Sequence, residues 1–133
     1  MCIYQDRAGL TWTVNNTLFG KLANREFSVE QKKLDIVKLH IAKFPRFLPN
    51  LIMLDRLEKA LDNNQTIAEA DASFYFHELK EAELMEQGYK WEEAHLKAIQ
   101  YYEVSAFSIY HPKAIAACPD EFNQKWKDCW GIE

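Results

Sequence analysis

Apolar residues recur at intervals of three and four along most of this chain, the spacing that places them on one side of an α-helix. The pattern predicts helices over about residues 28–44, 49–61, 66–88, 91–102 and 119–130. Pro45 ends the first of them, and Gly88 and Gly131 follow the third and the last, where a left-handed residue is common. The expected fold class is therefore mainly α, a small single-domain helical bundle.

Two sequence signals mark where helices are expected to begin. Ser28-Val-Glu-Gln31 and Thr66-Ile-Ala-Glu69 both have the form of a capping box, in which the first and fourth side chains bond each other's backbone N–H groups. The N-terminal segment differs, because β-branched and aromatic residues flank Asp6-Arg-Ala-Gly9, a composition typical of a turn. We expect a short β-hairpin over residues 2–14.

The helices expected within residues 66–102 are separated only by a few residues around Gly88. Such a short connection favours an antiparallel helical hairpin, in which residues equally far from the turn are neighbours. His95 of the second helix should then lie opposite the turn of the first helix that contains Glu81.

Four ionisable side chains fall on or beside the apolar sides of this hairpin. At about 100° per residue, Glu78 lies inside the apolar arc of the first helix, Glu81 at its edge and His77 further round. His95 lies near the centre of the apolar face of the second helix. Burying such groups is costly unless they are paired, hydrogen-bonded or bound to metal. The pattern therefore indicates a functional site or a buried pair.

One interpretation of the pattern is a catalytic metal site. His77 and Glu81 have the i, i+4 spacing that places two ligands side by side on a helix, and His95 or His111 supplies a third. The predicted ligands of zinc or another divalent metal are thus His77, Glu81 and His95. The predicted catalytic residues are Glu78, as general base, with His95 and His111. The run resembles the HExxH motif of zinc proteases with Glu81 in place of the second histidine, which favours a hydrolase.

Two other interpretations remain open. Glu78 or Glu81 can pair with His95 to fix the register of the helices, with His77 partly exposed and His111 capping the turn before Pro112. Alternatively, a histidine and a neighbouring carboxylate can carry acid–base chemistry without a metal.

Composition narrows the function classes. The chain has 133 residues, enough for one core and too few for two full domains. Its net charge of −4 gives no excess of Lys and Arg to neutralise phosphates, so nucleic-acid binding is not expected. No apolar run reaches the ~20 residues of a transmembrane helix, and we expect a soluble protein, cytoplasmic as produced. Three cysteines without zinc-finger spacing favour free thiols.

The run from Phe74-Tyr-Phe-His77-Glu78-Leu-Lys-Glu81 through Ala94-His95 to Tyr110-His111-Pro112 resembles a C-terminal module of Rhs-type and filamentous-haemagglutinin-type bacterial polymorphic toxins. The resemblance covers about residues 66–115. It implies an effector or toxin domain used in competition between bacteria, delivered into a rival cell and neutralised by a cognate immunity protein. The alternative is a non-enzymatic helical module, immunity-like or an adaptor, that binds a protein partner and keeps the His/Glu cluster as a structural pair.

Overall fold

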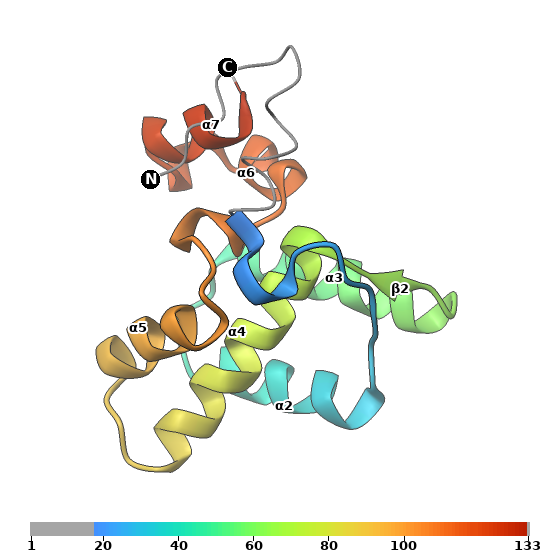
Figure 1. The fold of residues 1–133 in the computed structure, drawn as a ribbon, viewed down its shortest axis with the longest axis vertical. Coiled ribbons are helices and arrows are strands. Elements are labelled where there is room, and N and C mark those ends of the chain that lie inside the picture. Colours follow the sequence, from blue (N-terminus) through green and yellow to red (C-terminus); the bar gives the residue numbers. More distant parts are fainter. Residues whose placement is uncertain (1–17, 133) are drawn as a thin grey trace.

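The computed structural model of the chain describes residues 18–132 (Figure 1). This part of the chain forms six α-helices, three 3-10 helices and one two-stranded sheet, which confirms the mainly α class. The β-hairpin expected over residues 2–14 lies outside the described residues. The elements in order are η1 (Gly20–Leu22), β1 (Phe27–Ser28), α2 (Gln31–Ile41), α3 (Leu48–Asp62), β2 (Thr66–Ile67), α4 (Glu69–Glu86), α5 (Trp91–Tyr102), η2 (Ala106–Ser108), α6 (Pro112–Ala117), η3 (Pro119–Glu121) and α7 (Gln124–Trp130).

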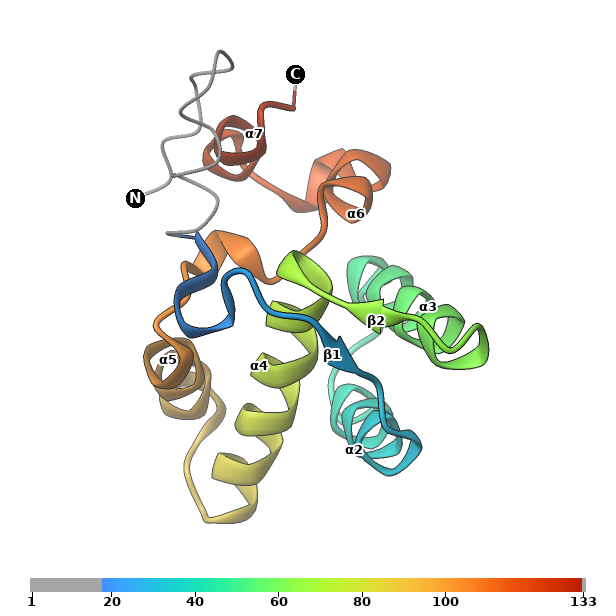
Figure 2. The same cartoon turned by 45° about the vertical axis from the view of Figure 1, so that its right-hand side comes forward.

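Helix α4 lies at the centre of the fold. It packs against α5 on one side and against α2 and α3 on the other (Figures 1 and 2). Phe74 and Tyr75 of α4 are almost completely buried in the main core, together with Leu34 of α2 and Met53 and Leu57 of α3. Because neighbours cover α4 on several sides, its first three turns are buried around most of the circumference, where the sequence predicted a single apolar side.

The chain turns back after α4 and brings α5 against it, which confirms the expected helical hairpin. Ala94 and Ala98 are the fully buried residues of α5, each with no exposed surface. Their small side chains let the α5 backbone approach α4 closely. Trp91, the first residue of this helix, is 44% exposed.

Both predicted capping boxes are wrong, because the structure places Ser28, Thr66 and Ile67 in strands. Phe27–Ser28 pairs antiparallel with Thr66–Ile67 (Figure 2). The following helices begin only at Gln31 and Glu69, and neither has a side-chain hydrogen bond at its N-cap. The Gln31 side chain instead donates to Asp35 at 2.9 Å. Pairing between two distant segments therefore replaces the local motif at both places.

The helix expected over residues 119–130 is divided in two. Phe122 is extended, with φ −128° and ψ 137°, and separates η3 from α7. Asn123 then caps α7 by accepting a hydrogen bond from the backbone N–H of Trp126 at 3.3 Å. Gly131 ends α7 in the left-handed region, with φ 68°, as expected.

The two cysteines in the described part of the chain differ in state. Cys118 is a buried free thiol, as expected. Cys129 is disulfide-bonded, so the expectation of a free thiol is wrong for this residue. Among the described helices, none has the length and apolar character needed to cross a membrane.

Candidate functional site

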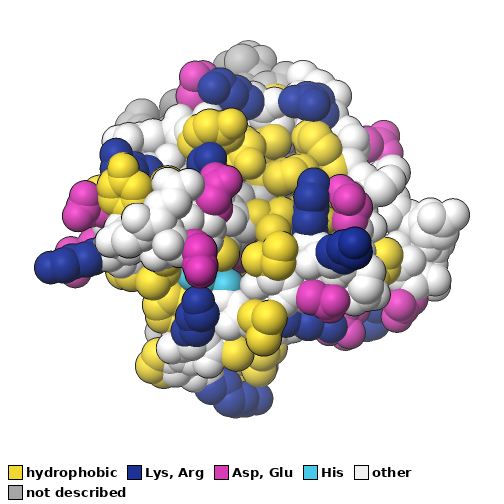
Figure 3. Space-filling model, turned by 90° about the horizontal axis from the view of Figure 1, so that it is seen from below, with side chains coloured by type: hydrophobic (Ala, Val, Ile, Leu, Met, Phe, Trp, Pro, Cys, Tyr) yellow, Lys and Arg dark blue, Asp and Glu magenta, His cyan; other side chains and the backbone are white. Residues whose placement is uncertain are grey.

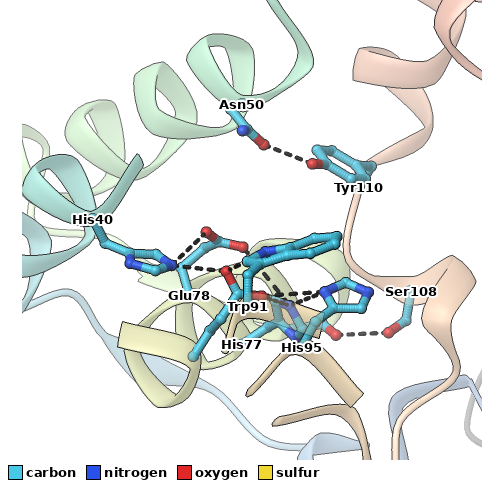
Figure 4. Close-up of polar contacts among 10 residues, drawn as sticks. His40, Asn50, His77, Glu78, Trp91, His95, Ser108 and Tyr110 are labelled. Carbon is cyan, nitrogen blue, oxygen red and sulfur yellow. Dashed lines mark hydrogen bonds and ion pairs between the residues drawn. The ribbon is translucent and has the colours of Figure 1, made fainter. Parts of the chain in front are cut away.

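Glu81 of α4 is the centre of a buried group of histidines and carboxylates, and its two oxygens face different partners. Oε1 lies 2.7 Å from Nε2 of His40 on α2 and 3.1 Å from Nε1 of Trp91 on α5. Oε2 lies 3.0 Å from Nε2 of His77 on α4 and 3.1 Å from Nδ1 of His95 on α5. We call His40, His77, Glu78, Glu81 and His95 the Glu81 cluster, of which Figure 4 labels the three histidines and Glu78.

Most of the Glu81 cluster is shielded from solvent. His40, His77 and Glu81 are 1 to 2% exposed, and Glu78 is 9% exposed. The His95 side chain is 29% exposed, so it is the most exposed member of the cluster. The Trp91 ring stacks on the His95 ring, with centroids 5.0 Å apart, and covers the cluster from the α5 side.

The structure brings together four of the residues that the sequence singled out. Glu81 and His95 meet across the α4–α5 hairpin as expected, and His77 and Glu78 lie beside them. His77 is 1% exposed, so the expectation that it is partly exposed is wrong. The reason is that α5 also covers the side of α4 beyond the predicted apolar arc, where His77 contacts His95.

Sequence reasoning missed His40, which makes the shortest contact to Glu81. His40 lies on the buried side of α2 next to Val37 and Ile41. A histidine among apolar neighbours at helical spacing was the same signal that pointed to His95, so His40 could have been found. Trp91 was also missed, because its indole N–H was not counted as a donor.

His111 does not join the Glu81 cluster. It is the N-cap of α6, where its Nδ1 accepts a hydrogen bond from the backbone N–H of Lys113 at 3.0 Å. Burial, and then the nearby Arg56 guanidinium, lower the pKa of His111, while Asp71 opposes them. The structure therefore places His111 next to the Arg56–Asp71 ion pair, where it caps the helix that begins at Pro112 and not the turn before it.

The buried histidines of the cluster have the features of neutral rings. Nδ1 of His40 and Nδ1 of His77 are buried and have no hydrogen-bond partner among the described residues. In a neutral ring that carries its proton on Nε2, Nδ1 is a bare acceptor, whereas an imidazolium would bury an N–H group without an acceptor. Burial also lowers the pKa of His77, although Glu81 opposes this.

The pKa values of the two carboxyl groups of the cluster are shifted in opposite directions. Burial disfavours the charged form of Glu81, but hydrogen bonds from His40, His77 and His95 outweigh this effect and lower the pKa of Glu81. None of the described residues donates a hydrogen bond to Glu78, and burial followed by the charge of Glu81 raises the pKa of Glu78 well above its usual 4.5. Neighbouring titratable groups with pKa values pushed apart are common where acid–base chemistry occurs.

The spacing of three ligand atoms fits a metal ion. His77 Nε2, His95 Nδ1 and Glu81 Oε2 are 3.0 to 3.1 Å apart from one another. Atoms that lie ~2.1 Å from one ion and at right angles to each other are ~3.0 Å apart. This group and a second one, made of His40, Glu78 and Glu81, could each hold a metal. The same distances are also those of direct hydrogen bonds, so they suit a structural cluster as well.

A cavity of about 310 Å³ opens beside the cluster and is lined by four of its members, all except His40. Apolar and aromatic side chains form much of the remaining wall. Tyr110 lies in this wall and donates its hydroxyl to Asn50 Oδ1 at 2.6 Å (Figure 4). Burial, and then Glu78 and Glu81, raise the pKa of Tyr110, so its hydroxyl stays protonated.

A larger hollow of about 680 Å³ lies between α2 and α4, and His40 is the cluster member that lines it. On the face of the molecule seen in Figure 3, a histidine side chain lies at the floor of a hollow that apolar and charged side chains surround. We place the candidate site at the smaller cavity, because four ionisable members of the cluster line it.

Comparisons with known proteins give no match for this chain, whether with protein-family models, with curated proteins or with solved structures. The function of the site is therefore inferred from its own geometry.

Proposed function

We propose that this protein is a metal-dependent hydrolase whose metal ion is held by His77, Glu81 and His95. The observation that carries the proposal is the convergence of three ligand atoms, 3.0 to 3.1 Å apart, at the wall of a cavity. Imidazole nitrogen and carboxylate oxygen suit zinc and other divalent transition metals. Ligand atoms this far apart would lie at right angles as seen from the ion, which favours an ion that accepts octahedral geometry.

Glu78 is the proposed general base. A bound divalent ion would lower the pKa of a water molecule and polarise the substrate. Glu78 lines the same cavity, and one of its oxygens lies 3.9 Å from His77 Nε2. Its raised pKa brings the carboxyl group closer to neutral pH, where a general base works best. With no hydrogen bond from the described residues to break, it can accept a proton directly.

The wall of the cavity supports a small, partly apolar substrate. Phe44, Phe47, Ile109 and Trp126 contribute apolar surface, and the Tyr110 hydroxyl is a protonated donor that can turn towards a substrate oxygen. About 310 Å³ is at the lower end of the volumes of small-molecule sites.

The biological setting that we propose is an effector domain of bacterial competition, with a cognate immunity protein as partner. What supports it is the resemblance over about residues 66–115. This run contains His77, Glu78, Glu81 and His95, which are four of the five members of the Glu81 cluster.

The first test is stabilisation by added metal. Protein without a histidine tag is treated with chelator and then titrated with Zn²⁺, Mn²⁺, Co²⁺ or Ni²⁺ while the thermal midpoint is measured. Metal is added because a weakly bound ion is lost during purification. Nδ1 of His77 lacks the hydrogen bond that usually supports a metal ligand, and this loss lowers the affinity for metal ~10–100-fold. At ~100 times the dissociation constant, stabilisation should be ~2.7 kcal/mol.

Two variants make this test specific. His95→Gln should lose the stabilisation, whereas His111→Gln, which removes a histidine outside the cluster, should keep it. Metal-loaded protein should also hydrolyse at least one chromogenic ester, amide or phosphoester, and Glu78→Gln should abolish this activity. Expression of the parent protein or of His111→Gln in bacteria should arrest growth, whereas expression of His95→Gln or Glu78→Gln should not. A parent protein that no metal stabilises would sink the proposal.

A second candidate function is a non-enzymatic module that binds a protein partner. Two observations favour it. The N–H donors of three histidines and a tryptophan surround Glu81, which satisfies this carboxylate without any ion. Apolar side chains around the larger hollow are also exposed, among them Ile36 at 46%, Leu39 at 69% and Tyr101 at 52%.

A further inference from the structure

Both carboxylates of the Glu81 cluster extend between His40 and His77. Glu81 directs Oε1 to His40 at 2.7 Å and Oε2 to His77 at 3.0 Å. The two oxygens of Glu78 also face different histidines: Oε1 lies 3.9 Å from His40 Nε2, and Oε2 lies 3.9 Å from His77 Nε2. His40 therefore lies on one side of the paired carboxylates and His77 on the other (Figure 4).

We propose that the protein binds two divalent cations bridged by Glu81, the first held by His77 and His95 and the second by His40 and Glu78. This proposal rests on the proposed function, whose metal ion is the first of the pair. Ions of such pairs are ~3.5–4 Å apart, a separation that the two oxygens of one carboxylate can span.

The distances around His40 are compatible with the second ion. Two atoms that each lie ~2.1 Å from one ion are at most ~4.2 Å apart. His40 Nε2 is 2.7 Å from Glu81 Oε1 and 3.9 Å from Glu78 Oε1, so both pairs are below this limit. One ligand atom from each of the three residues lies within 4.8 Å of the others, and all three residues are buried. The second ion would replace the 2.7 Å hydrogen bond between His40 and Glu81.

The charge of the cluster gives an independent reason for a second cation. Histidines are the only ion-pair partners of Glu78 and Glu81 among the residues that the structure describes. Two buried carboxylates without a cation are costly. Cations bound on both sides of the pair would remove this cost.

Glu78 gives the third argument. It is 9% exposed and accepts no hydrogen bond from the described residues, unlike Glu81, which has several donors. A buried carboxyl group in a native protein usually has partners. A ligand role at the second ion would supply a partner, and the role of Glu78 as general base then belongs to the protein that holds the first ion alone.

The test is the number of ions bound per chain. Chelator-treated protein is titrated with Mn²⁺, the bound metal is counted after gel filtration, and electron paramagnetic resonance detects magnetic coupling between neighbouring ions. The parent protein should bind two coupled ions. His40→Gln should bind one uncoupled ion, because the glutamine amide can still donate to Glu81 and maintain the fold but no longer offers an imidazole.

Control variants and alternative results make the test decisive. Glu78→Gln is the second variant, needed if His40→Gln does not fold, and it should also reduce the count from two to one. His111→Gln should still bind two. The parent protein could instead bind one uncoupled ion, which His40→Gln keeps and His95→Gln loses. This result would overturn the second metal site and leave the proposed function intact. No bound ion at all would overturn both.

Discussion

Glu78 and Glu81 show how the surroundings of one residue decide its chemistry. They lie on the same helix and are both buried, yet Glu81 is surrounded by N–H donors and Glu78 has none from the described residues. Donors stabilise a carboxylate and burial without donors destabilises it. Glu81 is therefore the stable anion of the site, and Glu78 is the group that can take up or release a proton.

Glu78→Gln should make the metal-free protein more stable at neutral pH. A carboxyl group whose pKa is raised on folding favours the folded state below its unfolded pKa of about 4.5, and this benefit is lost as pH rises. Glutamine does not titrate, so the variant should have the higher free energy of unfolding at about pH 7.5 and no such advantage at about pH 4. Urea unfolding in the presence of chelator measures both. Exposed Glu86→Gln is the control, and equal effects of the two substitutions would contradict the assignment.

At the scale of elements, the site depends on how α5 is fixed against the rest of the fold. The α5 helix supplies His95 and Trp91 and ends at Glu103, which is left-handed with φ 56°. Gly20 of η1 packs directly under this end: a Cβ added at Gly20 would lie 2.1 Å from the backbone oxygen of Glu103. The absence of a side chain at Gly20 is thus what lets η1 contact the end of α5.

Gly20→Ala should destabilise the protein more than Gly88→Ala. Both glycines have positive φ, 47° and 104°, so both substitutions introduce backbone strain. A Cβ at Gly88 meets nothing within 4 Å, whereas a Cβ at Gly20 clashes with backbone atoms. The difference between the variants should be ~1–3 kcal/mol, the usual cost of overpacking. Urea unfolding compares them, and equal midpoints would show that the contact between η1 and α5 does not matter for stability.

At the scale of the whole molecule, the cluster joins α2, α4 and α5 through buried contacts whose strength depends on protonation. Folding lowers the pKa of both Glu81 and His77. A group with a lowered pKa stabilises the fold above its unfolded pKa and loses this contribution as pH falls. For His77 the loss begins below its usual 6.5, and for Glu81 below its usual 4.5.

Mild acid should therefore loosen the fold of the metal-free protein. In the Glu78→Gln background, which removes the opposing titration, the free energy of unfolding should fall as pH decreases from about 7.5 to about 5. Adding His77→Gln should flatten this part of the profile. Chemical unfolding at a series of pH values provides the measurement. If the free energy of unfolding of the Glu78→Gln single variant does not change over this pH range, the assignment of a neutral buried His77 is contradicted.

The sequence by itself determined the helices and part of the candidate site. Periodic apolar residues identified α2 to α5, because helix burial repeats with the helical turn. The short connection at Gly88 was enough to bring His95 to Glu81. Only the tertiary structure decided that α2 adds His40, that α4 is buried on several sides and that His111 belongs elsewhere. It also paired Phe27–Ser28 with Thr66–Ile67 in place of two capping boxes. These features depend on contacts between segments far apart in the chain, which local spacing does not encode.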